Sequence, residues 1–547
     1  ILAQASSSEE PESHPPLFDP HIGAMWNRWI TLTAGIFAML CAGPIYTFGA
    51  IHSSIKTLLS ATELQVQLIG VAGDVGLWTK VFPGLAFDLL GARATMLGGA
   101  VLSGLGYVLM YFALLEQWPP VLVAGAWFLA GEGSGFILTS ALFASTKNFA
   151  PKDRGIVTGI LACMFGTSAT VLGSLLGGCL GGHIDNDGEC QEGFLGGSVT
   201  NYMVLLAVAI PAITIIAALA TRVREGHVTG ERDHASFRFT VLLVSLSTLI
   251  AVVFGKNLVE KLVEPSIKTW ANYVLLALLS LFLCLSVGAG PAGASPSKDT
   301  IADSETDSGQ ESTAAPSHSD DDKAGRPAEC QALFWSHFLA FGITIGVDLM
   351  TLNILSAIVA SRGMDHRTAG SLVVIQMGFD TTGRLASGFL VGKLKLTQLL
   401  VLAPALTVVG QILLAAGSSV GLYIACAMLG LSDGIMWTMG PLFIGKAFGL
   451  QRVGRHFGVT VLSAAIFQAA LSLGLEPFVY RQHTLAGETV CFGNSCFAAT
   501  HWTACAAACV AIAAALHVHF GWSGEAATGQ KEAGSGNDDL SDSSESS

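Results

Sequence analysis

Long apolar runs separated by short polar loops dominate the chain. A run of about twenty apolar residues suits a helix that crosses the ~30 Å hydrocarbon core of a bilayer. Six such runs precede residue 222, two more follow, and another six come after a polar linker. The pattern predicts an all-α membrane protein with about 14 transmembrane helices. The runs cover residues 29–50, 64–87, 94–115, 119–144, 155–180, 201–221, 239–255, 270–290, 333–356, 368–391, 397–417, 419–445, 456–476 and 498–520.

Two segments repeat each other at a constant offset. When Gly135–Gly155 is placed on Gly434–Gly454, an apolar helix, a short basic loop and a second apolar helix coincide. Internal repeats of membrane helices are typical of secondary transporters, whose site lies between the repeats. We therefore predict two pseudo-symmetric six-helix bundles with two additional spans between them. The coincident pairs are Gly135/Gly434, Thr139/Thr438, Lys147/Lys446, Phe149/Phe448 and Gly155/Gly454.

Composition supports this class of protein. Hydrophobic residues make up 51% of the chain, charged residues only 12%, and the mean hydropathy is +0.58. The net charge of −13 arises from Ser-, Gly- and Pro-rich segments that cannot bury a core and are expected to be disordered. Nothing indicates nucleic-acid binding. The expected divisions are an N-tail (1–27), an N-terminal bundle (28–222), two extra spans (223–290), an acidic linker (291–331), a C-terminal bundle (332–520) and an acidic C-tail (521–547).

Basic residues predict the orientation. With an even number of spans both termini lie on one side, and most of the 27 Lys and Arg residues then fall on that side. Basic loops favour the cytoplasm, so we predict cytoplasmic termini. The 239–255 run is short and could instead lie in the interface. No basic stretch leading into an apolar core opens the chain, so no signal peptide is expected.

A loop after the second run contains Gly84, Asp88, Gly91 and Arg93. This pattern resembles the loop motif of the major facilitator superfamily. The glycines allow a tight turn and close helix contact. Asp88 and Arg93 could form a charged latch between helix ends that breaks and re-forms as the bundles move.

A narrower resemblance, to nodulin-like membrane proteins, extends over most of the chain. It rests on short matches near Tyr46, Asp74, Arg384, Phe448 and Cys491. The resemblance implies a transporter fold with two additional spans, but not the cargo. The matched segments are Gly43–Gly49 with Tyr46, Ala72–Gly76, Gly383–Arg384, Ala447–Gly449 and Cys491–Phe497.

Charged residues occur inside the apolar runs. Each costs about 2.5–3.5 kcal/mol at mid-bilayer on insertion scales, so these residues should face a polar cavity or one another. The superfamily resemblance implies that helices one, two, four and five of each bundle line the cavity. A carboxylate there could carry a proton; alternatively it could form a structural ion pair. The cavity candidates are Asp74, Glu132, Asp348, Asp433, Lys80 and Arg384, with Tyr46 from the opening motif.

The repeat places Lys80 opposite Arg384, because each lies four residues before a glycine, Gly84 or Gly388. Asp380 lies one helical turn before Arg384, which favours an ion pair, whereas Lys80 has Gly76 at that position. The two basic residues could form a pair that holds an anionic substrate group. The alternative is that both side chains extend to the cytoplasmic interface.

The cysteines and the sequence motifs indicate which disulfides, metal sites and catalytic activities to expect. Cys491 and Cys496 lie in a loop predicted to be outside and could form a disulfide there, or remain free thiols; Cys190 could pair with Cys179. Spacing suggests no metal site and no cofactor. There is no phosphate-binding loop and no catalytic motif, so an enzyme is not expected, and Gly131, Gly133 and Gly135 are interpreted as helix-contact positions.

The favoured function is secondary active transport of a small molecule or ion by alternating access, with proton coupling through the buried acids as an option. The protein is expected to work as a monomer in the bilayer. A non-transporting sensor on the same fold is one alternative. A 14-span drug/proton antiporter is another, although the fifth run lacks the proline expected in that class. The membrane, plasma or internal, is not specified.

Overall fold

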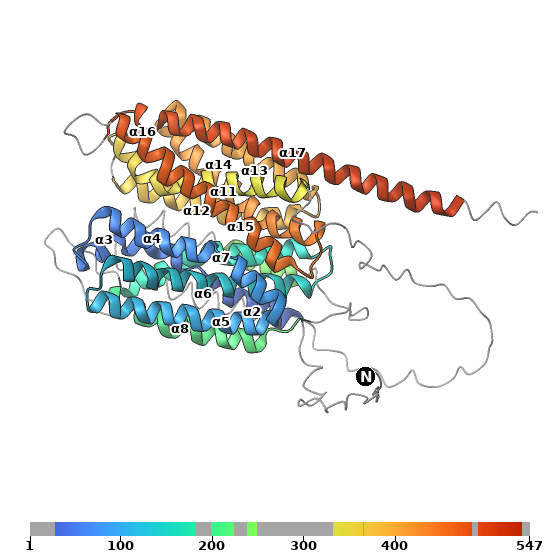
Figure 1. Ribbon diagram of the computed structural model, residues 1–547, viewed down its shortest axis with the longest axis horizontal. Coiled ribbons are helices and arrows are strands. Elements are labelled where there is room, and N and C mark those ends of the chain that lie inside the picture. Colours follow the sequence, from blue (N-terminus) through green and yellow to red (C-terminus); the bar gives the residue numbers. More distant parts are fainter. Residues whose placement is uncertain are drawn as a thin grey trace, which may run out of the picture.

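A computed structural model describes residues 28–180, 199–223, 238–248, 332–364, 366–483 and 491–538, and in these residues all regular structure is helical. We call residues 28–223 the N-terminal half and residues 332–538 the C-terminal half. The helices of the two halves gather on opposite sides of the molecule, with long axes running roughly alongside one another (Figure 1). Nine helices in the described part are long and apolar enough to cross a membrane.

The N-terminal half begins with a helix that is interrupted at Gly43–Pro44, so the run predicted at 29–50 is not one continuous helix. Proline lacks the backbone N–H that a helix interior uses, and a short 3-10 turn replaces the α-helix there. The elements are α2 (Arg28–Ala42), η1 (Pro44–Thr47), α3 (Phe48–Leu58), α4 (Glu63–Trp78), α5 (Val81–Leu115), α6 (Pro120–Lys147), α7 (Arg154–Leu180) and α8 (Val199–Ala220).

The run predicted at 64–87 is also interrupted. Helix α4 starts at a capping box in which Thr62 and Gln65 bond each other's backbone amide, and it ends at Trp78. Thr79 and Lys80 connect it to α5. Within α5, Gly91 has a φ of +80°, a conformation that glycine adopts without strain. This residue makes the bend predicted for the loop motif.

The C-terminal half contains a second set of long helices. The run predicted at 456–476 becomes α15 followed by a π-helical turn, and α17 continues past residue 520, the predicted end of the last span. The elements are α11 (Ala332–Ser361), α12 (His366–Leu390), α13 (Leu396–Ala416), α14 (Ser419–Ala447), α15 (Val453–Ala469), η3 (Ala470–Leu475), α16 (Glu476–His483) and α17 (Ser495–Asp538).

Small residues bring helices into close contact. A Cβ added at Gly131 would meet the backbone of Gly73 on α4, and one added at Gly133 would meet the backbone of Ser103 on α5. Small interface residues are what lets membrane helices approach this closely. These glycines therefore serve as helix contacts, as the sequence suggested.

The two halves touch along two seams, where α7 packs on α12 and α5 packs on α15. Glycines face each other across both. Gly84 opposes the backbone of Gly454, and Gly159 opposes Gly388. Backbone meets backbone at these points, so neither seam has room for a side chain.

A disulfide joins Cys491 to Cys496 at the end of the C-terminal half where α17 begins. The loop between them is fastened to two other helix ends. The backbone N–H of Gly493 donates to the carbonyl of Ser361, and the amide of Asn494 donates to the carbonyl of Ala415 at 2.8 Å.

Several predicted features lie wholly or partly outside the described residues. They include the N-tail, the 270–290 run, the acidic linker, and Cys190, the residue with which Cys179 could pair. Of the 239–255 run, a helix is described over Arg238–Thr248 only.

Candidate functional site

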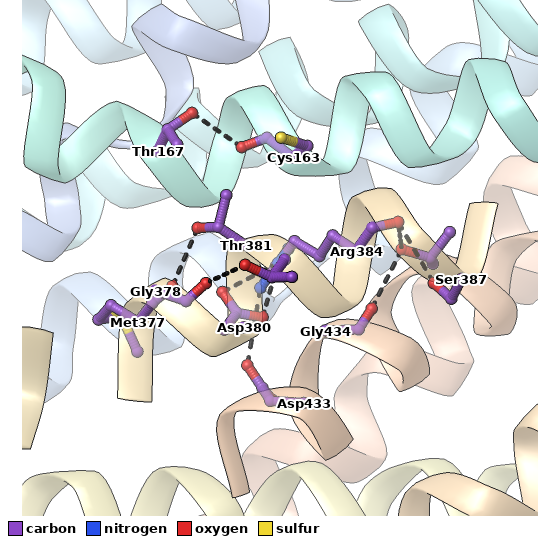
Figure 2. A network of polar contacts seen from close by, with 12 residues as sticks. Cys163, Thr167, Met377, Gly378, Asp380, Thr381, Arg384, Ser387, Asp433 and Gly434 are labelled. Atoms are coloured by element: carbon purple, nitrogen blue, oxygen red, sulfur yellow. Dashed lines mark hydrogen bonds and ion pairs between the residues drawn. The ribbon is translucent and has the colours of Figure 1, made fainter. Parts of the chain in front are cut away.

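A buried cluster of charges lies where α12 and α14 meet. Asp380 and Arg384 are one turn apart on α12, and the Arg384 Nε donates to both Asp380 carboxylate oxygens, at 2.8 and 3.0 Å. The Arg384 Nη2 also lies 3.6 Å from Asp433 Oδ2 on α14. Figure 2 shows the three side chains pointing toward one another. The guanidinium is thus balanced by two carboxylates, one from its own helix and one from its neighbour.

Glycines create the space for this cluster. A Cβ at Gly430 or Gly434 of α14 would meet the α12 backbone, so the two helices lie close enough for Asp433 to reach Arg384. On the other side, Gly166 of α7 faces the Arg384 side chain, whose Nε would be 3.2 Å from an added Cβ. The cluster therefore borders the seam between the halves.

Lys80 lies at the break between α4 and α5, with only 1% of its surface exposed. Its Nζ is 4.8 Å from the Trp437 ring centroid and 5.7 Å from that of Phe457, both in the other half. Among the described residues, Lys80 has neither an ion pair nor a hydrogen bond. The interpretation that Lys80 extends to the membrane interface is wrong, because the C-terminal half covers it.

Arg384 does not extend to the interface either, because Asp380 and Asp433 hold it inside the protein. Its Cζ lies 5.7 Å from the same Trp437 ring that Lys80 contacts. The structure therefore brings Lys80 and Arg384 to one indole, although only Arg384 has carboxylate partners among the described residues.

Asp348 on α11 is buried next to this cluster. Its carboxyl oxygens lie 3.0 and 3.3 Å from the Thr407 hydroxyl of α13, which in turn lies 2.7 Å from the Ser432 hydroxyl of α14. Asp348 also interacts electrostatically with Asp380 and Asp433. Three cavity candidates, Asp348, Asp433 and Arg384, thus belong to one connected group.

Tyr46 and Asp74 approach the same group from the N-terminal half. The Tyr46 hydroxyl interacts electrostatically with Asp74, Arg384 and Asp433, and its ring packs edge-on against Phe165. Tyr46 therefore lies close to the charges of the other half, and among the described residues Asp74 is connected to them only through Tyr46.

Glu132 is buried on α6, and neither of its carboxyl oxygens has a hydrogen-bond partner among the described residues. No charged group in the described part of the chain interacts with it either. The structure therefore does not connect Glu132 to the central cluster.

The loop motif contacts helix ends, but not as the sequence suggested. Asp88 and Arg93 were expected to act as one latch. Instead, Asp88 accepts hydrogen bonds from the backbone amides of Gly454 and Arg455 at the start of α15, at 3.2 and 2.8 Å. A carboxylate is favourable at a helix N-terminus because of the unpaired amides and the helix dipole.

Arg93 binds the C-terminal end of a helix, where backbone carbonyls are free to accept. Its Nε donates to the carbonyl of Thr221 at 2.7 Å, beyond the C-terminus of α8. Only the Asp88 contact crosses between the halves, so only Asp88 can latch one half to the other.

Replacing Asp88 by alanine is expected to weaken closure of this seam by about 1 kcal/mol, the usual cost of losing a capping side chain. Transport should slow a few-fold without loss of folded protein. Initial uptake rates at matched expression would check this. The control is Asp153→Ala, which removes an acidic side chain from the loop before α7. An unchanged rate would show that the latch does not limit the cycle.

Sequence reasoning missed the uncharged members of the site. Trp437 lies one turn after Asp433, so its position on the same helix face was available from spacing alone. Phe457, Thr407 and Ser432 come from helices whose pairing only the tertiary structure specifies. In the described part of the chain no group of three metal-binding side chains occurs.

The sequence is similar to one protein family and to several known proteins. Residues 28–288 match the Nodulin-like family. The chain is similar to Protein NUCLEAR FUSION DEFECTIVE 4 of Arabidopsis thaliana, with 22% identity across 86% of this chain and 85% of that protein. It is also 28% identical to the Probable transporter mch1 of Aspergillus fumigatus over 26% of this chain and 25% of that one.

Solved structures support the fold over nearly the full length. The major facilitator proton:xylose symporter XylE, bound to 6-bromo-6-deoxy-D-glucose, superposes with a TM-score of 0.57 at 11% identity, over 90% of this chain and 95% of XylE. The major facilitator transporter FucP in its outward conformation gives 0.51 at 14% identity, over 90% and 99%. The sequence of residues 28–288 therefore resembles the Nodulin-like family, and the chain shares its fold with these two transporters over most of its length.

Proposed function

We propose that this protein is a secondary active transporter that moves a small organic anion across a membrane by alternating access, coupled to protons. The observation that carries the proposal is the buried ammonium of Lys80 between the halves. An ammonium removed from water without an anionic partner costs several kcal/mol. Two aromatic rings return on the order of 2 kcal/mol each, but they carry no negative charge. A substrate carboxylate or similar group would supply the missing partner.

The surroundings of Lys80 define the substrate class. Arg384 is balanced by Asp380 and Asp433, so it is less available to a ligand than Lys80. Trp437 and Phe457 present apolar faces beside the Lys80 ammonium. We therefore propose an anion with an apolar body, bound by Lys80 from one half and by Trp437 from the other.

The two seams support the proposal of alternating access. The contact between Gly84 and Gly454, with the Asp88 bonds, closes one end between two six-helix units that we propose to rock about the central site. Asp433 is the proposed proton carrier. It lies beside Asp380 and Arg384, and its second oxygen has no hydrogen-bond partner among the described residues. The similar protein XylE is a proton:xylose symporter.

The proposed topology has about 14 spans with both termini in the cytoplasm. It follows the basic loops, and it places the Cys491–Cys496 disulfide on the opposite, oxidising side. A glycosylation reporter in the loop at residues 484–490 should be modified, whereas one fused after residue 538 should not.

The test is uptake into proteoliposomes from a panel of labelled monocarboxylates, amino acids, sugars and cations, with and without a proton gradient. An anion should accumulate with the gradient. Lys80→Ala should reduce uptake at least tenfold, Lys80→Arg should retain part of it, and the exposed-site control Lys152→Ala should be neutral.

Three outcomes would contradict the proposal. Undiminished anion uptake in Lys80→Ala at normal expression would remove Lys80 from the site. Uptake of neutral solutes alone would refute the substrate class while leaving a carrier. No flux of any solute, with intact binding, would favour the sensor.

A further inference from the structure

Three short oxygen–oxygen contacts link Asp348 to the backbone of α13. The Asp348 carboxyl lies 3.0 Å from the Thr407 hydroxyl, and Thr407 lies 2.7 Å from the Ser432 hydroxyl. The Ser432 hydroxyl lies 2.8 Å from the carbonyl oxygen of Ala403. All three side chains are buried, with at most 1% of their surface exposed. Water is therefore not available to complete these bonds.

Counting hydrogens decides how this chain of contacts is arranged. A carbonyl oxygen only accepts, so the Ser432 hydrogen must point to Ala403. Thr407 must then donate to Ser432, because two oxygens 2.7 Å apart with no hydrogen between them repel. The two hydroxyl hydrogens are now used. The contact between Asp348 and Thr407 requires a third hydrogen, which only the carboxyl group can supply.

The surrounding charges agree with a neutral Asp348. From α12 it faces Asp380, and from α14 it faces Asp433, and these two carboxylates share the guanidinium of Arg384. Ionised Asp380 and Asp433 already outnumber the single guanidinium. Its neighbour on α13 is the uncharged Thr407, and α11 meets α17 and the end of α15 through apolar side chains such as Ala504 and Phe467. A further negative charge would face two carboxylates.

We infer that Asp348 is a proton-binding site, distinct from Asp433, whose proton holds α11 against α13 and α14 in this conformation. When Asp348 loses its proton, its hydrogen bond with Thr407 changes direction, because Thr407 must then donate to the carboxylate. Its contact with Ser432 is left without a hydrogen, and the three helices must separate at this point. The role of this site in transport rests on the proposed function. In a proton-coupled transporter, α11 would move each time Asp348 binds or releases its proton.

The neighbouring contact shows that the arrangement is specific to Asp348. One turn further along α11 and α13, the Gln411 amide donates to Thr351 and its oxygen accepts from His501 Nδ1. The hydrogens there are all supplied by neutral groups. Only the Asp348 contact lacks a donor unless a proton is added.

Infrared difference spectroscopy of the purified protein in lipid tests this without any transport assay. A carbonyl band of a protonated carboxylic acid should be present at neutral pH and absent in Asp348→Asn. The amide of Asp348→Asn brings its own hydrogens, so this variant should keep the contact with Thr407 at every pH. The unmodified protein should lose stability as Asp348 loses its proton, so raising the pH should lower its melting temperature more than that of Asp348→Asn.

The matched control is Ser463→Ala, which removes a buried hydroxyl on α15 that does not touch Asp348. Its proton affinity should equal that of the unmodified protein. The inference is overturned if no band depends on Asp348, or if raising the pH lowers the melting temperatures of Asp348→Asn and of the unmodified protein equally. Either result leaves the transport proposal standing, and failed uptake leaves the infrared result standing.

Discussion

Replacing Arg384 by methionine is expected to abolish transport and to lower the stability of the folded protein by about 3–5 kcal/mol, because it leaves buried carboxylates without their counter-charge. Asp380 loses the two bonds at 2.8 and 3.0 Å, and Asp433 loses its contact at 3.6 Å. Thermal unfolding in detergent and proteoliposome uptake would measure the two effects.

A second variant separates charge balance from function. In Arg384→Met combined with Asp380→Asn and Asp433→Asn, no unpaired charge remains at the cluster, and uncharged replacements of buried ion pairs are often neutral in stability. Folding should recover while transport stays lost. If the single variant is as stable as the unmodified protein, the cluster is not the buried ion network described above.

Replacing Gly84 by valine is expected to prevent closure of the seam between α5 and α15. The added Cβ would meet the carbonyl of Gly454, and overpacking of this kind costs about 1–3 kcal/mol. The cost applies to the closed seam alone, so populations should shift about tenfold to a hundredfold toward a conformation in which it is open. The protein should fold normally but fail to complete its cycle.

Distances between spin labels would show this shift. Labels at exposed positions 152 and 393 flank the contact of Gly155 with Val391 at the same end of the molecule, in a background without other reactive cysteines. The distance should lengthen in Gly84→Val. It should not change in Gly125→Val, because nothing lies within 4 Å of a Cβ there. Equal distances in both variants would contradict the proposed rocking.

Local spacing explains what could be predicted from the sequence. Asp380 and Arg384 lie on one helix, so four residues of separation were enough to anticipate their pairing. Apolar runs likewise located the long helices, and the loop and opening motifs pointed to the family that matches residues 28–288. The breaks at Gly43–Pro44 and before Val81 carried weaker signals, a Gly-Pro pair and a polar Thr-Lys pair within apolar sequence.

Long-range contacts explain what could not be predicted. Lys80 lies near the end of its apolar run, where a lysine alone would reach the interface. Only the position of α14 and α15 from the other half shows that Trp437 and Phe457 cover it. In the same way, the motif predicted a latch formed by Asp88 with Arg93, but the partner that Asp88 has, the start of α15 more than 360 residues away, could not be identified from the loop itself.

The disulfide loop has a consequence for how the C-terminal half can move. The ring between Cys491 and Cys496 ties the beginning of α17 to the ends of α11 and α13 through Gly493 and Asn494. These three helix ends must travel together as a single rigid plate. A passage that opens at that end therefore has to form beside this group of three helix ends and not between them. Reducing the disulfide would let the three ends move apart.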